Sequence, residues 1–155
     1  MDDEPPYDIA VNKVCGGAPD CEQQLADAVR AALKHHQVPK AQISVALVSD
    51  GQIAELNERH LGHEGPSDVI TFDLRDDPSQ PIDGEIVVSV DTARREGDQR
   101  GHGTEVELSL YAVHGVLHLI GYDDREETDA ARMHDKEDEI LSSLGIGPAF
   151  RSERK

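Results

Sequence analysis

Short apolar runs separated by polar loop segments predict four β-strands. Residues 7–14 alternate apolar and polar side chains, which is the pattern of a half-buried strand. Residues 43–48 are dense in β-branched and aliphatic side chains, and residues 69–74 and 86–90 form two further short apolar runs. The segment between the last two runs, residues 75–83, is polar and contains prolines, so we expect a surface loop there.

Apolar residues that recur at helical spacing predict helices between and after these strands. They are expected at residues 20–36, 50–61, 91–96 and 126–144, with a loop over 97–103. Asp20 is expected to cap the first of these helices, and Ser49 or Asp50 the second. Helices and strands alternate irregularly along the chain, which favours one α+β or α/β domain with a small sheet.

A further segment, residues 104–120, is apolar nearly all round and predicts a buried helix that runs through the middle of the domain. Thr104 and Glu107 have the spacing of a capping box, which would close the start of this helix. Gly121 is expected to end it, because glycine adopts a positive φ at little cost.

Two histidines lie four residues apart on this central helix. At that spacing His114 and His118 leave the same helix face, with Cβ atoms roughly 6 Å apart, so two ring nitrogens can meet one metal ion. After Gly121 the chain can turn back and bring the carboxylate of Asp124 to the same point. One histidine on an apolar helix face is usually a core residue, but the pair with a following Gly and acid predicts a metal site.

The ligand pattern leaves alternatives open. Its spacing is that of the metzincin peptidases with Asp124 in the third ligand position, but Gly115 replaces the glutamate that acts as their general base. Zn²⁺ is the first expectation, and a carboxylate ligand also favours Mn²⁺ or iron, as in the non-haem iron oxygenases. Asp123 could compete with Asp124 as the ligand.

Composition restricts the function further. The chain has 155 residues, which is the length of a single domain. Its formal net charge is −17, and such a charge repels polyanions at long range. An RNA-binding surface would therefore have to be a local basic patch. The candidates are Arg94, Arg95 and Arg100, with His60 and His63.

Segments for secretion or membrane insertion are not evident in the sequence. No apolar run approaches the roughly 20 residues of a membrane span, and the acidic N-terminus lacks the apolar core of a signal peptide. The expected location is the cytoplasm, where Cys15 and Cys21 would be free thiols.

Residues 114–124 resemble the signature of the YbeY family, H-G-x-L-H-L-x-G-Y-D-H. The chain follows this signature from His114 to Asp123 and departs from it at Asp124, where the family has histidine. Residues 65–73, preceded by Leu56-Asn57, and residues 84–89 resemble two further family stretches in the same order. The resemblance spans about residues 40–145.

The resemblance implies a fold and a function. The fold would be α+β, a single YbeY-like metal-hydrolase domain over residues 1–155, with about four strands in a mixed sheet packed by helices and disordered tails at 1–5 and 151–155. The function would be that of a metal-dependent, single-strand-specific endoribonuclease in 16S rRNA 3′-end maturation and ribosome quality control. Its metal, Zn²⁺ or another divalent ion such as Mn²⁺, would be held by His114, His118 and Asp124.

The implied partners are single-stranded RNA, ribosomal RNA and the small ribosomal subunit, without DNA or a membrane. The alternative is a non-catalytic ribosome-assembly factor with a structural metal; a metallopeptidase is less favoured. Many family members carry an arginine where this chain has Leu61. Met133 and Glu137 resemble the family's downstream Met and Glu, but we expect a core residue and an exposed charge, without a catalytic role. No general base is identified.

Overall fold

A computed structural model describes residues 7–58, 69–77, 79–122 and 127–145. These residues form an α+β fold, as predicted, with a four-stranded sheet and helices. In chain order the elements are β1 (Tyr7–Lys13), α1 (Glu22–His35), β2 (Ala41–Val48), α2 (Asp50–Leu56), β3 (Val69–Asp73), β4 (Ile82–Ser89), α3 (Val90–Arg100), α4 (Thr104–Ile120) and α5 (Glu127–Ser143).

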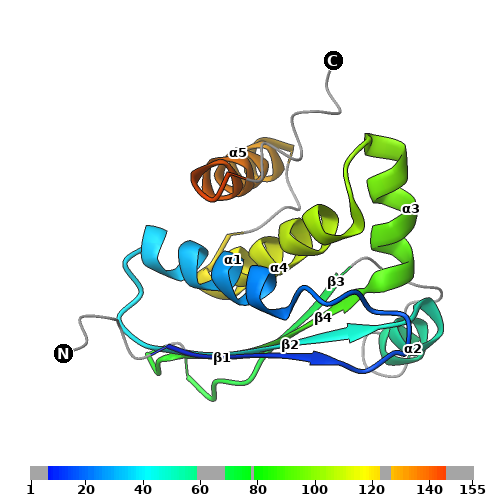
Figure 1. Ribbon diagram of the computed structural model, residues 1–155. Coiled ribbons are helices and arrows are strands. Elements are labelled where there is room, and N and C mark those ends of the chain that lie inside the picture. The colour runs from blue at the N-terminus through cyan, green and yellow to red at the C-terminus, as the bar shows by residue number, and fades with distance from the viewer. Residues whose placement is uncertain (1–6, 59–68, 78, 123–126, 146–155) are drawn as a thin grey trace.

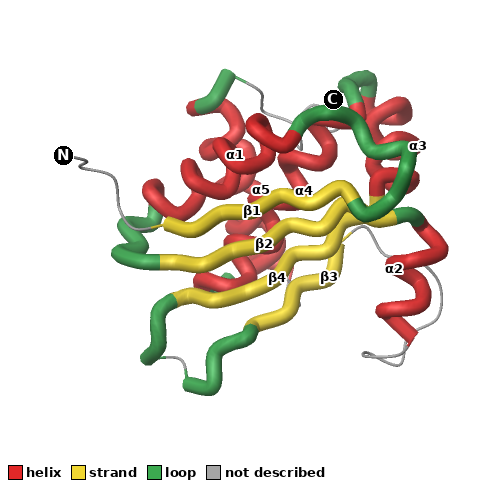
Figure 2. Tube along the Cα trace, turned by 60° about the horizontal axis from the view of Figure 1, so that its bottom comes forward, coloured by secondary structure: helices red, strands yellow, loops and turns green. Residues whose placement is uncertain are grey.

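The sheet is mixed, with the strand order β1-β2-β4-β3 (Figure 2). β1, β2 and β4 run parallel, and β3 pairs antiparallel with β4. Parallel neighbours need a crossover connection, and α1 supplies it between β1 and β2. The sheet therefore carries a helical layer on one face, where α1 and α4 lie (Figure 1).

Strand alternation divides the core between the two faces of the sheet. Ile86 and Val88 of β4 join the larger core with α1, α4 and α5. Val87, which points the other way, packs with Ile53 of α2 in a smaller cluster on the opposite face. α4 contacts α1, α3, α5, β3 and β4, and most of its side chains are buried, so the prediction of a central buried helix is confirmed.

Two glycines allow α4 to lie directly against the sheet. A Cβ atom on Gly115 would lie 2.7 Å from Cγ2 of Ile86, and one on Gly84 would lie 2.6 Å from Cδ1 of Leu119. Because cores are close-packed, a side chain at either position would push the helix away from β4. The two glycines thus set the distance between the sheet and α4, which carries the histidines.

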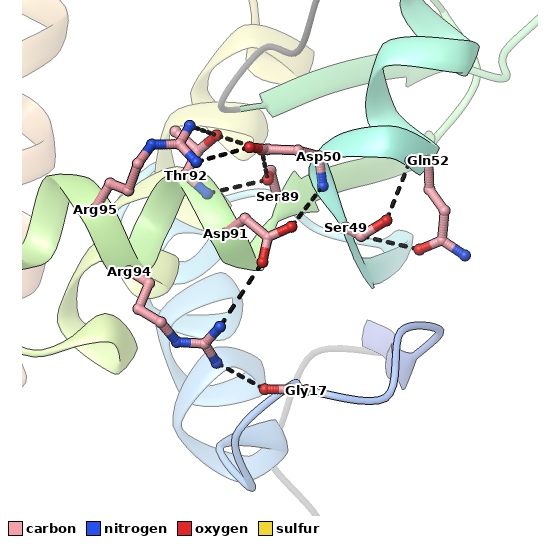
Figure 3. A network of polar contacts seen from close by, with 9 residues as sticks. All are labelled: Gly17, Ser49, Asp50, Gln52, Ser89, Asp91, Thr92, Arg94 and Arg95. Atoms are coloured by element: carbon pink, nitrogen blue, oxygen red, sulfur yellow. Dashed lines mark hydrogen bonds and ion pairs between the residues drawn. The ribbon is translucent and has the colours of Figure 1, made fainter.

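α2 and α3 begin side by side and are linked at their first turns (Figure 3). The Asp50 carboxylate accepts hydrogen bonds from the Ser89 and Thr92 hydroxyls, at 2.6 and 2.8 Å, and from the Arg95 guanidinium at 2.7 Å. The backbone N–H of Asp50 in turn donates to the Asp91 carboxylate at 2.9 Å. Each helix therefore supplies hydrogen-bond partners to the start of the other.

Several expected element boundaries differ from the structure, and for two of them the physical reason is clear. α3 does not stop before Gly97 but continues to Arg100, because Gly97 is buried against the backbone of His102 and only its lack of a side chain permits that contact. The helix ends instead at Gly101, with φ 79°. β4 begins at Ile82 rather than residue 86, because backbone pairing with β2 continues through the polar residues 83 and 85.

Two of the expected helix caps were also wrong. α1 starts at Glu22 after Cys21, and Asp20 forms an ion pair with Lys13 instead of capping the helix. Gly103 is the N-cap of α4, and the buried Glu107 side chain contacts Arg100 and His102 instead of the backbone. The cap at Ser49 is confirmed as a full capping box with Gln52.

Two further observations concern the cysteines and the character of the helices. Cys15 and Cys21 are free thiols, as expected. Within the described ranges, no helix combines the length and the apolar character that crossing a membrane requires.

Candidate functional site

The helical spacing of His114 and His118 brings their rings together on α4. Their Nε2 atoms lie 3.1 Å apart, and the two ring planes are nearly perpendicular, at 84°. Gly121 has φ 128°, and its backbone N–H bonds the carbonyls of Leu117 and His118, so the helix ends where the sequence predicts.

The other nitrogen of each ring is held by a hydrogen-bond acceptor. Nδ1 of His114 donates to the Glu137 carboxylate at 2.5 Å, and Nδ1 of His118 donates to the backbone carbonyl of Tyr122 at 3.2 Å. The Tyr122 hydroxyl contacts Nε2 of His36 at 2.9 Å, which anchors this turn to the end of α1. Both imidazoles are therefore fixed in orientation by partners outside α4.

These hydrogen bonds determine what the facing nitrogens can do. A neutral imidazole that donates at Nδ1 has its lone pair at Nε2, so both Nε2 atoms, 3.1 Å apart, can act as metal ligands. Two nitrogens at 2.0–2.1 Å from one tetrahedral ion lie about 3.3 Å apart. The pair thus fits a shared cation, and the donor set suits a transition metal such as zinc.

Glu137 is the partner that the sequence reasoning missed. It is not the exposed charge we expected, because its side chain is only 1% exposed and contacts His114 of α4. Burial would raise the pKa of this carboxyl, but hydrogen bonds from His114 and His134 outweigh burial and hold the pKa below its usual range. Its burial could have been predicted from the sequence, because Glu137 lies at helical spacing from Met133, Ile140 and Leu141, which form the buried face of α5. Met133 is buried, as expected.

A small cavity of about 70 Å³ lies beside His114. Its polar lining comes from Arg100, His114, His134 and Glu137, and its apolar lining from Val69, Leu110 and Tyr111. His134 donates to Glu137 at 3.0 Å, and its ring stacks at 6.5 Å from that of His114. α3, α4, α5 and β3 all contribute to this cavity, so it depends on the whole fold.

The third expected ligand cannot be placed, because Asp123 and Asp124 lie outside the described residues, as do Leu61, His60 and His63. Among the residues that are described, no group of three or more His, Cys, Asp or Glu side chains could hold a metal ion. Within the described part of the chain, His114 and His118 could therefore supply only two of the ligands of a metal site.

The three arginines after β4, which were candidates for a local basic patch, each form an ion pair with an acidic side chain. Arg94 pairs with Asp91 and donates to the Gly17 carbonyl, while Arg95 pairs with Asp50 (Figure 3). Arg100 alone of the three lines the cavity at His114. Arg94 and Arg95 instead form contacts around the first turns of α2 and α3.

A larger hollow, of about 530 Å³, lies at the other end of the sheet. It is lined by the starts of β2 and β4 and by the β3–β4 loop, including Lys40, Arg75 and Asp83. Arg75 forms a two-bond ion pair with Asp73, so much of its charge is already compensated. None of the described residues that line this hollow is His or Cys, and the site at α4 is the better candidate for chemistry.

Comparison with known proteins gives consistent matches. The family model described as endoribonuclease YbeY matches residues 12–145. The endoribonuclease YbeY of Desulfitobacterium hafniense is 37% identical over 134 residues, covering 81% of this chain and 83% of that protein. The endoribonuclease YbeY of Nocardioides sp. is 37% identical over 136 residues, covering 82% and 91% respectively.

A solved structure supports the architecture. The solution structure of TM1509 from Thermotoga maritima has a TM-score of 0.59 to this chain at 24% identity, and covers 91% of this chain and 94% of its own. At this identity the similarity establishes the fold alone, and it agrees with the α+β arrangement described above.

Proposed function

Because the chain belongs to the endoribonuclease YbeY family, we propose that it is a metal-dependent endoribonuclease that cleaves single-stranded RNA. The observation that carries this proposal is the facing pair of Nε2 atoms on His114 and His118, each ring held at Nδ1 by a separate acceptor. Catalytic metal sites commonly orient their histidine ligands in this way.

In the proposed site His114, His118 and Asp124 hold a divalent ion, with Zn²⁺ as the first candidate and Mn²⁺ as the second. When bound, such an ion supplies Lewis-acid activation of water and of a phosphoryl oxygen at neutral pH. Glu137 would keep the proton of His114 on Nδ1 and so leave its Nε2 available to the ion, and the Tyr122 carbonyl would do the same for His118.

The family also suggests the biological role. We propose that the chain acts in the cytoplasm on ribosomal RNA of the small subunit, in 16S rRNA 3′-end maturation and ribosome quality control. Its formal net charge of −17 means that attraction to RNA must come from a few local groups rather than from the whole surface.

A second candidate is a ribosome-assembly factor whose metal ion is structural. The net charge of −17 favours it, and so does the replacement of the family's third histidine by Asp124. Such a protein would bind metal and RNA or ribosomal particles without cleaving RNA.

The test is cleavage of a single-stranded RNA oligonucleotide by protein loaded with Zn²⁺ or Mn²⁺. The His114→Ala variant is compared with His35→Ala, a matched histidine on α1 that lies outside the site. We expect cleavage by the wild type and by His35→Ala, and loss of cleavage in His114→Ala and in chelator-treated wild type. Metal binding without cleavage would support the assembly factor, and cleavage that survives His114→Ala would contradict the proposed site.

A further inference from the structure

Tyr122, the residue that follows Gly121, connects the end of α1 with the candidate site. Its backbone N–H donates to the Leu117 carbonyl at 2.9 Å. Its hydroxyl lies 2.9 Å from Nε2 of His36, and the two rings meet edge to face with their centroids 5.3 Å apart. Its carbonyl lies 3.2 Å from Nδ1 of His118. A histidine of α1 is therefore linked to a candidate metal ligand through a single residue.

The hydrogen-bonding groups in this series have defined roles. Nδ1 of His36 lies 3.1 Å from the Ala32 carbonyl, which can only accept, so Nδ1 carries the proton. In a neutral imidazole Nε2 then accepts, and the Tyr122 hydroxyl donates to it. The Tyr122 carbonyl can likewise only accept, so Nδ1 of His118 carries the proton and Nε2 has the lone pair. A backbone carbonyl thus sets the tautomer of each histidine, and Tyr122 joins the two.

The bond from the Tyr122 N–H does not by itself direct the Tyr122 carbonyl. That bond holds the peptide group before the Cα atom, whereas the carbonyl belongs to the peptide group after it, and the two soft dihedrals lie between them. Gly121, with φ 128°, adds conformational freedom at the same turn. Rotation about the N–Cα bond of Tyr122 moves its side chain and its carbonyl together. A side chain held by His36 therefore restricts where the carbonyl points.

His36 lies in a well-defined helix end, which makes it a firm anchor. It is the C-cap of α1, and the next residue, Gln37, has a φ of 56°, which turns the chain out of the helix. The N–H of Val38 then donates to the Leu33 carbonyl at 3.0 Å. The Tyr7 hydroxyl of β1 donates to the Val38 carbonyl at 2.6 Å. The segment that follows His36 is thus fixed to both α1 and the sheet.

We propose that His36 is a positioning residue for the metal site. Through the Tyr122 hydroxyl it holds the carbonyl that keeps Nε2 of His118 available to the ion. This inference rests on the proposed function and deepens it, because it adds α1 to the elements that shape the site. His36 contacts neither the ion nor the RNA in this proposal and acts through Tyr122. Removing the outer partners of metal-bound histidines typically weakens metal binding roughly 10–100-fold.

The first test measures Zn²⁺ affinity by competition against a chelating dye. Tyr122→Phe removes the donor and His36→Leu removes the acceptor, so each should bind Zn²⁺ about tenfold more weakly. His36→Gln should recover most of the affinity, because its amide oxygen can accept the same hydrogen bond. Tyr7→Phe is the matched control: it removes a tyrosine hydroxyl bond near the end of α1, outside this series, and should keep the wild-type affinity.

A double variant separates positioning from a general loss of stability. Tyr122→Phe/His36→Leu removes both sides of one contact, so its Zn²⁺ affinity should equal that of either single variant. Melting curves of all the variants check that each is folded. Additive weakening in the double variant, or wild-type affinity in either folded single variant, would overturn the positioning role.

A measurement on the metal-free protein separates this inference from the proposed function. At about pH 8 ordinary imidazoles are neutral, and ¹⁵N NMR distinguishes ring nitrogens that carry a proton from those that do not. His118 should carry its proton at Nδ1 in the wild type and in Tyr7→Phe, and should shift toward the Nε2 tautomer in Tyr122→Phe and His36→Leu. His118→Gln identifies its signals by their loss.

The outcomes of the two tests are distinct. The expected changes in His118 tautomer and in Zn²⁺ affinity, in a protein that does not cleave RNA, would overturn the proposed function but keep the positioning role of His36. An unchanged His118 tautomer in folded Tyr122→Phe and His36→Leu would overturn the positioning role even if the wild type cleaves RNA.

Discussion

At the scale of single residues, two carboxylates are each held by several hydrogen bonds, one in the candidate site and one at the start of α2. Glu137 fixes the ring of His114, and Asp50 joins the first turns of two helices. Each carboxylate has a pKa below its usual value because its hydrogen-bond donors outweigh the effect of burial. Both therefore act as fixed negative charges at neutral pH, and each makes a separate prediction.

The substitution Glu137→Gln should weaken metal binding while leaving both histidines in place. The amide lacks the negative charge that makes the His114 imidazole a stronger ligand, so we expect a 10–100-fold loss of metal affinity. Competition against a chelating dye measures the affinity. Glu139→Gln, an exposed glutamate on the same helix, is the control, and equal affinities in the two variants would contradict the role of Glu137.

The substitution Asp50→Asn should destabilise the protein by about 2 kcal/mol at pH 7, because charged hydrogen bonds are lost. Burial raises the pKa of this carboxyl, but bonds from Ser89, Arg95 and Thr92 bring the pKa below 3.8. The wild type therefore has this stabilisation above about pH 3.8 and loses it as the pH falls through the folded-state pKa.

Urea unfolding across pH 2–7 measures this effect. The difference in unfolding free energy between wild type and Asp50→Asn should shrink toward zero at the acid end. The control is Asp98→Asn, at an exposed position of α3, which should have the unfolding free energy of the wild type at every pH. A difference that stays constant with pH would show that the Asp50 charge does not carry the stabilisation.

At the scale of elements, the packing distance between α4 and the sheet depends on a glycine of α4 that faces β4. Gly115→Ala adds a Cβ atom within 2.9 Å of three atoms of the buried Ile86 side chain. We expect a loss of about 1–3 kcal/mol in unfolding free energy from overpacking, despite the higher helix propensity of alanine. Thermal or urea unfolding measures it.

Gly51→Ala is the matched control for this substitution. Gly51 is also in a helix, but its nearest neighbour would lie 3.9 Å from the added Cβ, so alanine there should be neutral or slightly stabilising. If Gly115→Ala is as stable as Gly51→Ala, the close approach of α4 to the sheet does not limit the packing.

Periodicity in the sequence predicts the elements of this fold better than their ends. α4 and the spacing of its histidines follow from local rules, because helical geometry alone places residues i and i+4 together. The end of α3 does not follow, since the helix passes Gly97 only because another segment packs there. The Thr104–Glu107 capping box fails for the same reason, as Glu107 finds partners in a neighbouring turn.

In the candidate site, too, the sequence predicts local contacts but not contacts between distant elements. The convergence of His114 and His118 is local, whereas the contact between His114 and Glu137 joins α4 to α5 across 23 positions in the chain. The position of Glu137 among the apolar residues of α5 indicates that its side chain is buried. It does not indicate which residue on another helix that side chain contacts. The cavity with Arg100 likewise requires α3, α4, α5 and β3 to be in place together.

At the scale of the whole molecule, the formal net charge of −17 should determine how RNA cleavage responds to salt. The Debye length is about 30 Å at 0.01 M and about 8 Å at 0.15 M ionic strength, so salt screens the long-range repulsion between protein and RNA. We expect kcat/KM for a short single-stranded RNA to rise several-fold over this range. A basic nuclease would show the opposite trend, and a steep fall with salt would contradict this prediction.

The central claim of this account is that His114 and His118 share one metal ion. The most direct measurement is the metal content of protein loaded with Zn²⁺ or Mn²⁺ and freed of loosely bound ions by gel filtration. The account predicts about one ion per chain in the wild type and in His35→Ala, and little or none in folded His114→Ala and His118→Ala variants. A wild type that retains no ion, or histidine variants that retain a full one, would contradict it.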